Sequence, residues 1–446
     1  MVLPVLAALL SCLPLLMPSS LLATAWIVAL GRQGVITSAL QAALGGSGWT
    51  VFSLSGAAGA LALRYFGVAV LILTHHRPQQ AGSWPVERAF CIPWPARAFH
   101  LYLGREIRPA AAAWLVVMLL CMNDHVLPDM LLQSTYGTQI LIMYSALMDA
   151  AAAAAMAAPV GLVGVLLVAA ALQIARATWI ADDNPVTDRP APAPAWSKAL
   201  AATGAVGILA LAMAAPAGVL IYRTPSWSAL GEALYLARDQ AWQTLRLSAA
   251  AGIATALLAA ALTARWLSCQ RSGRFSAAPL VMLNLVVPPS LIGMGAIELA
   301  NHWPLSVLRD TSWPLVLAYV ARFLPAAMLL LYIAWRNEPA LPRQAARVHG
   351  ASPWQIAARI QWPARRLSLA VAALLCMLLA ATELDVSLLL SPPGGGTLGV
   401  RLATLIHTAS DPVVSALALD ILLLVAPAMA LLIVLAMRAA RRGRAT

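Results

Sequence analysis

The chain is built from apolar runs of about twenty residues, each long enough for a helix to cross a bilayer. Short segments between the runs gather the basic residues and many of the prolines. Backbone in lipid must satisfy its own hydrogen bonds, so uniformly apolar runs of this length fold as helices. The sequence predicts an all-α polytopic membrane protein with about ten transmembrane helices, roughly at residues 9–30, 52–75, 109–131, 152–175, 199–222, 245–267, 278–300, 313–335, 367–391 and 413–437.

Charge is scarce and unevenly placed. Only 10% of the 446 residues are charged, against about a quarter in soluble domains. The net charge of +12 does not indicate nucleic-acid binding, because the basic residues form no stripe. Of 29 Lys and Arg, 21 lie in 76–108, 176–198, 265–277, 336–366 and 438–446, and five in the loops on the opposite side. This excess predicts a bacterial inner-membrane protein with both termini in the cytoplasm.

The N-terminus and the middle of the chain suggest its organisation. No basic residue precedes Arg32, so the first run is expected to remain as a span rather than act as a signal peptide. The stretch DDNPVTDRPAPAPAWS (182–197) is polar and then proline-rich, as in semi-rigid linkers. We therefore predict an N-terminal module of about four spans, a cytoplasmic linker and a C-terminal module of six, at 1–180, 181–198 and 199–446.

The two modules resemble each other in sequence. Residues 108–140 parallel 367–399 at a constant offset of 259. Shared leucine and alanine would align anywhere, so the weight rests on Arg, acidic and Pro matches. These are Arg64 with Arg322, Asp124 with Glu383, and MPSSL (17–21) with VPPSL (287–291), and the same offset aligns Thr138 with Thr397. We predict an internal duplication whose first copy lacks spans 199–222 and 245–267, either because the chain is naturally short or because its start lies upstream.

The basic segment 336–366 predicts an amphipathic helix–turn–helix. Gly350 permits a backbone reversal, and Ser352 followed by Pro353 suits the N-cap and first position of a second helix. Pro363 is expected to end that helix. Apolar residues are expected to share one side of the two helices, namely Ala345, Ala346, Ile356, Ile360 and Trp362.

This segment resembles the signature loop of permease subunits of binding-protein-dependent ABC importers: EAA, three residues, G, nine residues, I, one residue, LP. The spacing is kept, with Gln344 in place of Glu and Trp362 in place of Leu. The matching residues are Gln344, Ala345, Ala346, Gly350, Ile360, Trp362 and Pro363. The first module carries a degenerate version at 85–104, with Glu87, Pro93, Trp94 and Gly104.

The resemblance implies two pseudo-symmetric helical modules around a central path. It implies that the loop docks on an ABC ATPase subunit, which would be a homodimer, and that a periplasmic solute-binding protein docks on the other side. No cofactor is expected on this chain, and ATP and Mg would lie on the partner. The only lysine is Lys198, which follows no glycine-rich loop, so the chain itself has no P-loop.

An enzyme is disfavoured, because the chain has neither HExxH nor GxSxG and its seven histidines are scattered. Each histidine, His125 included, is expected to be solvated or interfacial. Cysteine and histidine spacing predicts no metal site.

Five charged residues near the membrane are candidates for the translocation path. They are Arg64, Arg322, Asp124, Glu383 and Asp385. The arginines either take part in transport, or form structural ion pairs with acids such as Asp124, Glu298 or Glu383, or extend their side chains to the membrane surface. The three acids either line the outer exit of the pore or are simply hydrated.

The cargo is the least determined feature. The stretch ATELDVSLLLSPPGGGTLGVRLATLIH and the fusion of two modules resemble the ferric-iron branch of these permeases. Thiamine, phosphonate, polyamines and inorganic anions remain alternatives within the family. A secondary transporter driven by an ion gradient is the alternative from another class, although it would not need the 344–363 loop.

Overall fold

The computed structural model describes residues 7, 9–44, 50–75, 104–179, 203–224, 226–271, 278–336, 338, 341–391 and 396–445. Every regular element in these ranges is helical. In the first part of the chain the helices are α2 (Ser19–Leu30), α3 (Val35–Leu44), α4 (Leu54–His75), α7 (Gly104–Asn123), α8 (Val126–Met130), α9 (Tyr136–Ser145) and α10 (Ala150–Trp179).

The second part is longer. Its α-helices are α12 (Ala215–Arg223), α13 (Trp227–Leu236), α14 (Arg238–Arg271), α15 (Ala278–Met282), α16 (Pro289–Asn301), α17 (Trp313–Trp335), α18 (Leu341–Val348), α19 (Pro353–Ile356), α20 (Trp362–Ala381), α21 (Asp385–Leu390), α22 (Leu398–Thr408) and α23 (Asp411–Ala445). Short 3₁₀ turns are η1 (Leu13–Leu16), η5 (Leu283–Leu285) and η6 (Leu305–Leu308), and π turns are η4 (Ala210–Ala214) and η7 (Ala357–Gln361).

Eight helices among the described residues are long and apolar enough to cross a membrane. They are Ser19–Ala39, Leu54–Thr74, Ala150–Ile174, Thr203–Arg223, Arg238–Cys269, Trp313–Trp335, Pro353–Ala381 and Asp411–Ala439. The other two predicted spans are shorter pieces: Ile107–Asn123 is an apolar helix below spanning length, and 278–300 is broken at Pro288. The described helices thus confirm a membrane-spanning helical protein, and the count of ten stays a prediction.

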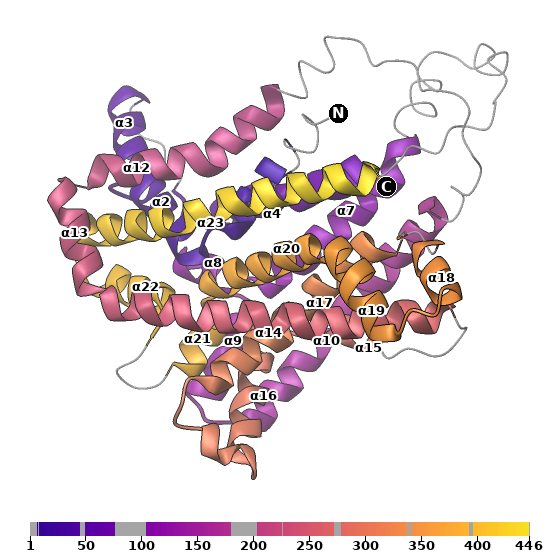
Figure 1. The fold of residues 1–446 in the computed structure, drawn as a ribbon. Coiled ribbons are helices and arrows are strands. Elements are labelled where there is room, and N and C mark those ends of the chain that lie inside the picture. Colours follow the sequence, from indigo (N-terminus) through magenta and orange to yellow (C-terminus); the bar gives the residue numbers. More distant parts are fainter. Residues whose placement is uncertain are drawn as a thin grey trace, which may run out of the picture.

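The long helices lie side by side (Figure 1), and the largest buried cluster joins α14, α17 and α20. Its centre holds Tyr319, Met328 and Leu331, which are at most 1% exposed. Helices α18 and α19 lie at the end of the bundle where the C-terminus lies, and α13 lies at the other end (Figure 1).

Two helix breaks have nearly the same backbone. Pro18 precedes α2 with φ −55° and ψ 137°, and Pro288 precedes α16 with φ −55° and ψ 140°. Each follows a 3₁₀ turn, η1 or η5. Proline cannot donate a hydrogen bond, so a helix is interrupted there and resumes after it. The MPSSL and VPPSL segments therefore adopt the same local structure.

Two predicted spans were wrong at their C-terminal ends, because 109–131 and 367–391 do not continue through their acidic residues. Helix α7 ends at Asn123 and α20 at Ala381. Asp124 Oδ1 accepts from the backbone N–H of Leu127 at 3.3 Å, and Glu383 Oε1 accepts from that of Val386 at 3.5 Å. Each carboxylate caps the short helix that follows it, α8 or α21, and so favours the break.

The order of elements recurs along the chain. Helices α4, α7, α8, α9 and α10 are followed, in the same order, by α17, α20, α21, α22 and α23. The predicted equivalence of Thr138 and Thr397 was wrong, because it is Thr135 that caps α9 as Thr397 caps α22. Helix α21 is one residue longer than α8 and the loop before α22 is two residues longer than the loop before α9, which together shift the offset from 259 to 262. The linker 181–198 lies outside the described residues.

Candidate functional site

Arg64 and Asp124 form a buried ion pair between α4 and the end of α7. Arg64 Nε lies 3.2 Å from Asp124 Oδ2, and the side chains are 9% and 5% exposed. The hydroxyl of Tyr65 donates to Asp124 Oδ2 at 2.9 Å, and Arg64 Nη1 donates to the carbonyl oxygen of Met17 at 2.9 Å. Because that carbonyl lies at the Pro18 break, Arg64 satisfies an acceptor that the interrupted helix leaves open.

Arg322 forms the corresponding pair between α17 and the end of α20. Its Nη1 lies 2.9 Å from Glu383 Oε1 and 3.5 Å from Asp385 Oδ2. The two acids are held together, since the Asp385 N–H donates to Glu383 Oε1 at 3.1 Å. Tyr319 and Ser387 share a hydrogen bond of 2.7 Å beside them. The two arginine–acid pairs thus occupy matching places in the recurring element order.

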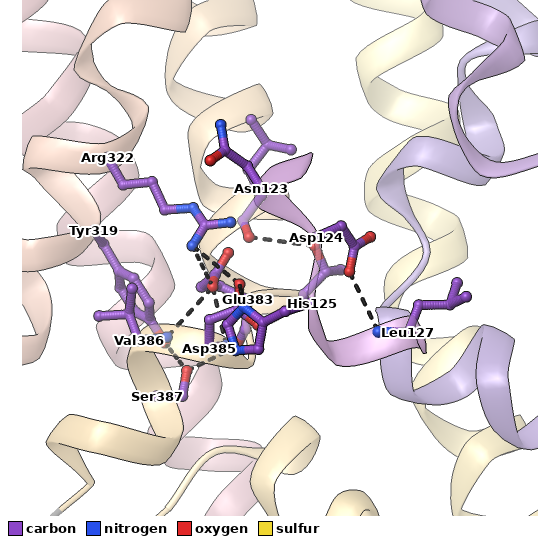
Figure 2. A network of polar contacts seen from close by, with 12 residues as sticks. Asn123, Asp124, His125, Leu127, Tyr319, Arg322, Glu383, Asp385, Val386 and Ser387 are labelled. Atoms are coloured by element: carbon purple, nitrogen blue, oxygen red, sulfur yellow. Dashed lines mark hydrogen bonds and ion pairs between the residues drawn. The ribbon is translucent and has the colours of Figure 1, made fainter. Parts of the chain in front are cut away.

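His125 joins the two pairs. Its Nδ1 lies 3.8 Å from Asp385 Oδ2, while its neighbour Asp124 belongs to the first pair. Figure 2 shows the imidazole reaching toward Asp385 and the Asp124 carboxylate pointing away, toward Leu127. Asn123 adds a second link, because its amide donates to the carbonyl oxygen of Leu285 at 3.1 Å. Three consecutive residues at the α7–α8 break therefore contact three different elements.

The structure brings the five predicted path residues together. Their burial decides whether the three acids are simply hydrated. Pairing of Arg64 with Asp124 and of Arg322 with Glu383 is confirmed. The alternative of simple hydration was wrong, because Asp124, Glu383 and Asp385 are only 6–8% exposed. Hydropathy placed these acids at the outer ends of spans, where water would reach them. Their ion pairs with arginine and their hydrogen bonds to backbone N–H groups instead allow them to be buried.

His125 was missed as a functional candidate, and of the two environments expected for it, solvated or interfacial, the solvated one was wrong. It is 4% exposed, whereas His302, His349 and His407 are exposed. Its adjacency to Asp124 was the one available signal. The repeat gave none, because the aligned residue in the second half is Leu384.

The predicted loop at 344–363 is a helical hairpin with Gly350 at its turn. Gly350 has a φ of +76°, a conformation that favours glycine. Ser352 forms a full capping box with Gln355: the Ser352 hydroxyl accepts from the Gln355 N–H and the Gln355 side chain accepts from the Ser352 N–H. Pro353 occupies the first turn. The turn and the start of the second helix are confirmed as predicted.

The predicted end of the second helix at Pro363 was wrong. The helix continues from Pro353 to Ala381 without interruption. The π turn η7 (Ala357–Gln361) immediately precedes Trp362, so the widened turn accommodates a proline that lacks its N–H. The second half of the loop is therefore the cytoplasm-proximal end of a transmembrane helix in the predicted topology.

The predicted apolar side is found only in part. Ile356 is buried at 7%, Ala346 and Ile360 are half-buried, and Ala345 is exposed together with Gln344. Trp362, which belongs to the predicted side, is 56% exposed, and three further large apolar side chains are exposed as well: Leu341 at 75%, Val348 at 85% and Trp354 at 78%. The segment 341–362 thus carries four large apolar side chains that the described residues leave mostly exposed.

The degenerate first loop is described only at its last residue. Gly104 begins α7, and Glu87, Pro93 and Trp94 lie outside the described residues. No protein-family model matches the chain, and no curated protein matches its sequence.

Proposed function

We propose that this chain is the transmembrane permease subunit of an ABC import system, which moves a small periplasmic solute into the cytoplasm using ATP hydrolysed by a separate subunit. The observation that carries the proposal is the hairpin α18–α19. It keeps the spacing of the importer signature loop, turns at a glycine with positive φ, and presents exposed apolar side chains at one end of the bundle. An exposed apolar surface of this kind marks an interaction site.

The proposed partner of this surface is the groove of an ABC ATPase. A short, capped helix that continues directly into a membrane span would transmit displacement from the ATPase to α20. Because α19 is continuous with residues 362–381, a push on α19 would reach the end of α20, two residues before Glu383, along one helix. A periplasmic binding protein is proposed to deliver the solute at the opposite end.

Two modules fused in one chain are proposed from the recurring element order and the matched proline breaks and arginine pairs. In this arrangement the first module lacks counterparts of the span Thr203–Arg223 and of α14. The path would pass between the modules, at the level where His125 meets Asp385. With 109–131 and 278–300 counted as interrupted spans, the membrane is crossed ten times and both termini are cytoplasmic.

Ferric iron is the proposed cargo, supported by the resemblance and by the three acids around Arg322 and Arg64. Thiamine, phosphonate, polyamines and inorganic anions are the alternative cargoes within the family, and uptake assays with each of them beside ferric iron test this proposal.

The topology can be tested with two matched cysteines. Val348→Cys lies on the hairpin and Val307→Cys lies in η6, and both native side chains are more than 80% exposed. In intact cells a membrane-impermeant maleimide should label residue 307 only, and permeabilisation should add residue 348. Labelling of residue 348 in intact cells would refute a cytoplasmic loop.

The partner can be tested by purifying the tagged chain from its host in mild detergent. An ABC ATPase should be retained and should be lost from the double variant Val348→Glu/Trp354→Glu, which disrupts the exposed apolar surface. Solute uptake driven by an ion gradient in liposomes holding this chain alone would instead support a secondary transporter.

A further inference from the structure

The apolar centre of α14 is bounded by an arginine at each end. Residues 247–264 contain no charged side chain and are flanked by Arg246 and Arg265. As a helix this run rises about 27 Å, close to the hydrocarbon thickness of about 30 Å. Arg246 therefore lies at the boundary between hydrocarbon and headgroups, toward the end of the bundle where α13 meets the start of α14 (Figure 1).

Arg246 has no counter-charge within the described part of the chain. Its side chain is exposed, and it forms no ion pair or hydrogen bond with a described residue. Arginines in membrane segments are normally paired inside the bundle, as Arg64 and Arg322 are here. The acid of α14, Asp239, lies about 10 Å away along the helix, and Arg238 Nε is 3.8 Å from its Oδ1. The positive charge of Arg246 is thus left for a partner outside the bundle.

The face of α14 that carries Arg246 continues into the bilayer as apolar side chains. Ile253 is 56% exposed and Leu257 is 57% exposed, and they follow Arg246 by seven and eleven residues. These spacings are two and three helical turns, so the three side chains share one side of the helix. Ile253 and Leu257 lie about 10 Å and 16 Å deeper than Arg246, which is the depth of acyl chains.

Trp242 lies one turn from Arg246 in the opposite direction, toward the headgroups. It is 59% exposed, and the spacing of four residues places it on the same side of α14. Tryptophan is enriched at this depth, because its ring is apolar and its N–H donates a hydrogen bond. Helical side chains lean toward the N-terminus, so the guanidinium of Arg246 extends toward Trp242 and the headgroups.

We infer that this face of α14 binds one phospholipid, with the phosphate at Arg246 and Trp242 and the acyl chains along Ile253 and Leu257. Guanidinium and indole N–H groups donate and do not accept, which suits phosphate oxygens and excludes a cation. The apolar continuation of the face selects a lipid phosphate over a free anion. An anionic lipid is favoured, because the charge of Arg246 is uncompensated. This inference goes beyond the proposed function and requires only that α14 crosses the membrane.

Native mass spectrometry of the purified chain tests the site without any ATPase. The chain in mild detergent is mixed with phosphatidylglycerol, and one lipid should be retained more tightly than further copies. Its retention should weaken by about tenfold in Arg246→Gln, which removes a charge-assisted hydrogen bond, and less in Arg246→Lys. Arg309→Gln is the matched control, because Arg309 is 60% exposed beside Asp310 as Arg238 is beside Asp239, and it should retain the lipid as the wild type does.

Trp242→Ala is a second variant of the same face and should weaken retention several-fold. Diacylglycerol, which lacks the phosphate, should not be retained. Three outcomes overturn the inference: equal lipid retention by wild type and monodisperse Arg246→Gln and Trp242→Ala chains, no tightly retained lipid on the wild type, or displacement of the lipid by excess inorganic phosphate. Because retention of an ATPase is measured separately, a negative lipid result leaves the permease proposal standing, and loss of the ATPase leaves the lipid site standing.

Discussion

The guanidinium of Arg365 donates three hydrogen bonds to the carboxylate of Glu338, of 2.9, 3.1 and 2.7 Å. The same guanidinium lies 4.4 Å above the ring of Trp335, whose indole N–H donates to Ser368 at 2.8 Å. Trp335 is the last residue of α17, Glu338 follows it by three residues, and Arg365 lies in the first turn of α20, so these contacts join the two ends of the segment that carries the hairpin.

Arg365→Lys should loosen this fastening while keeping the charge. Lysine cannot reproduce a bidentate fork or stack on the indole in the same way, and each lost charge-assisted bond is worth about 1.5–3 kcal/mol. If the hairpin transmits force, solute uptake by the reconstituted importer should fall several-fold while ATP hydrolysis persists. The neighbouring exposed Arg366→Lys is the control and should leave uptake unchanged. Equal uptake by both variants would show that the fastening does not serve coupling.

Gly350→Asp should abolish uptake and uncouple ATP hydrolysis without preventing membrane insertion. At φ +76° a non-glycine residue is strained by about 1–2 kcal/mol, although no atom lies within 4 Å of a Cβ built there. Aspartate and asparagine tolerate this conformation better than other residues, so the loss in Gly350→Asp is expected mainly from the negative charge that it adds to a basic hairpin, whereas Gly350→Val tests the backbone conformation itself. Gly350→Asn is the matched test, because asparagine tolerates this conformation and should retain more uptake than Gly350→Val. Normal uptake by Gly350→Asp would remove the coupling role of the turn.

The sequence predicted the elements whose determinants are local. The run 313–335 matches α17 at both ends, because apolar residues and Pro314 define it without reference to the rest of the fold. The turn at Gly350 and the cap at Ser352 were likewise readable, since backbone freedom and capping act within four residues. The alignment matched the two arginines and two of the acids with which they pair, Asp124 and Glu383, but left open which arginine pairs with which acid and kept Glu298 as a third candidate.

What was mispredicted depends on contacts between distant residues. Whether Asp124 ends a helix depends on Arg64 and Tyr65, some sixty residues away, which hold its carboxylate in position to cap α8. The burial of His125 depends on Asp385, in the other half of the chain. Pro363 was predicted to end a helix because the amino-acid sequence does not indicate the π turn at Ala357–Gln361. That turn lets the helix continue through the proline.

Asp124→Asn should destabilise the fold far more than the surface change Asp129→Asn. The amide keeps the size of the side chain but leaves the charge of Arg64 buried and unpaired, at a cost of roughly 3–5 kcal/mol. Asp129 is exposed and should tolerate the change. Melting of the purified proteins in detergent measures the difference, and coincident melting curves would contradict a structural ion pair.

Gly252→Ala should weaken the packing of α14 on α20, although alanine is the better helix former. A Cβ at Gly252 would lie 2.7 Å from the carbonyl oxygen of Ala373 and 2.8 Å from the backbone nitrogen of Met377, and backbone cannot move aside cheaply. Small residues allow membrane helices to approach this closely, and overpacking typically costs about 1–3 kcal/mol. Gly218→Ala is the matched control in α12, since nothing lies within 4 Å of its Cβ and helix propensity alone favours it by about 1 kcal/mol. The melting midpoint should therefore fall for Gly252→Ala and hold or rise for Gly218→Ala, and the reverse order would mean that α14 and α20 do not meet at Gly252.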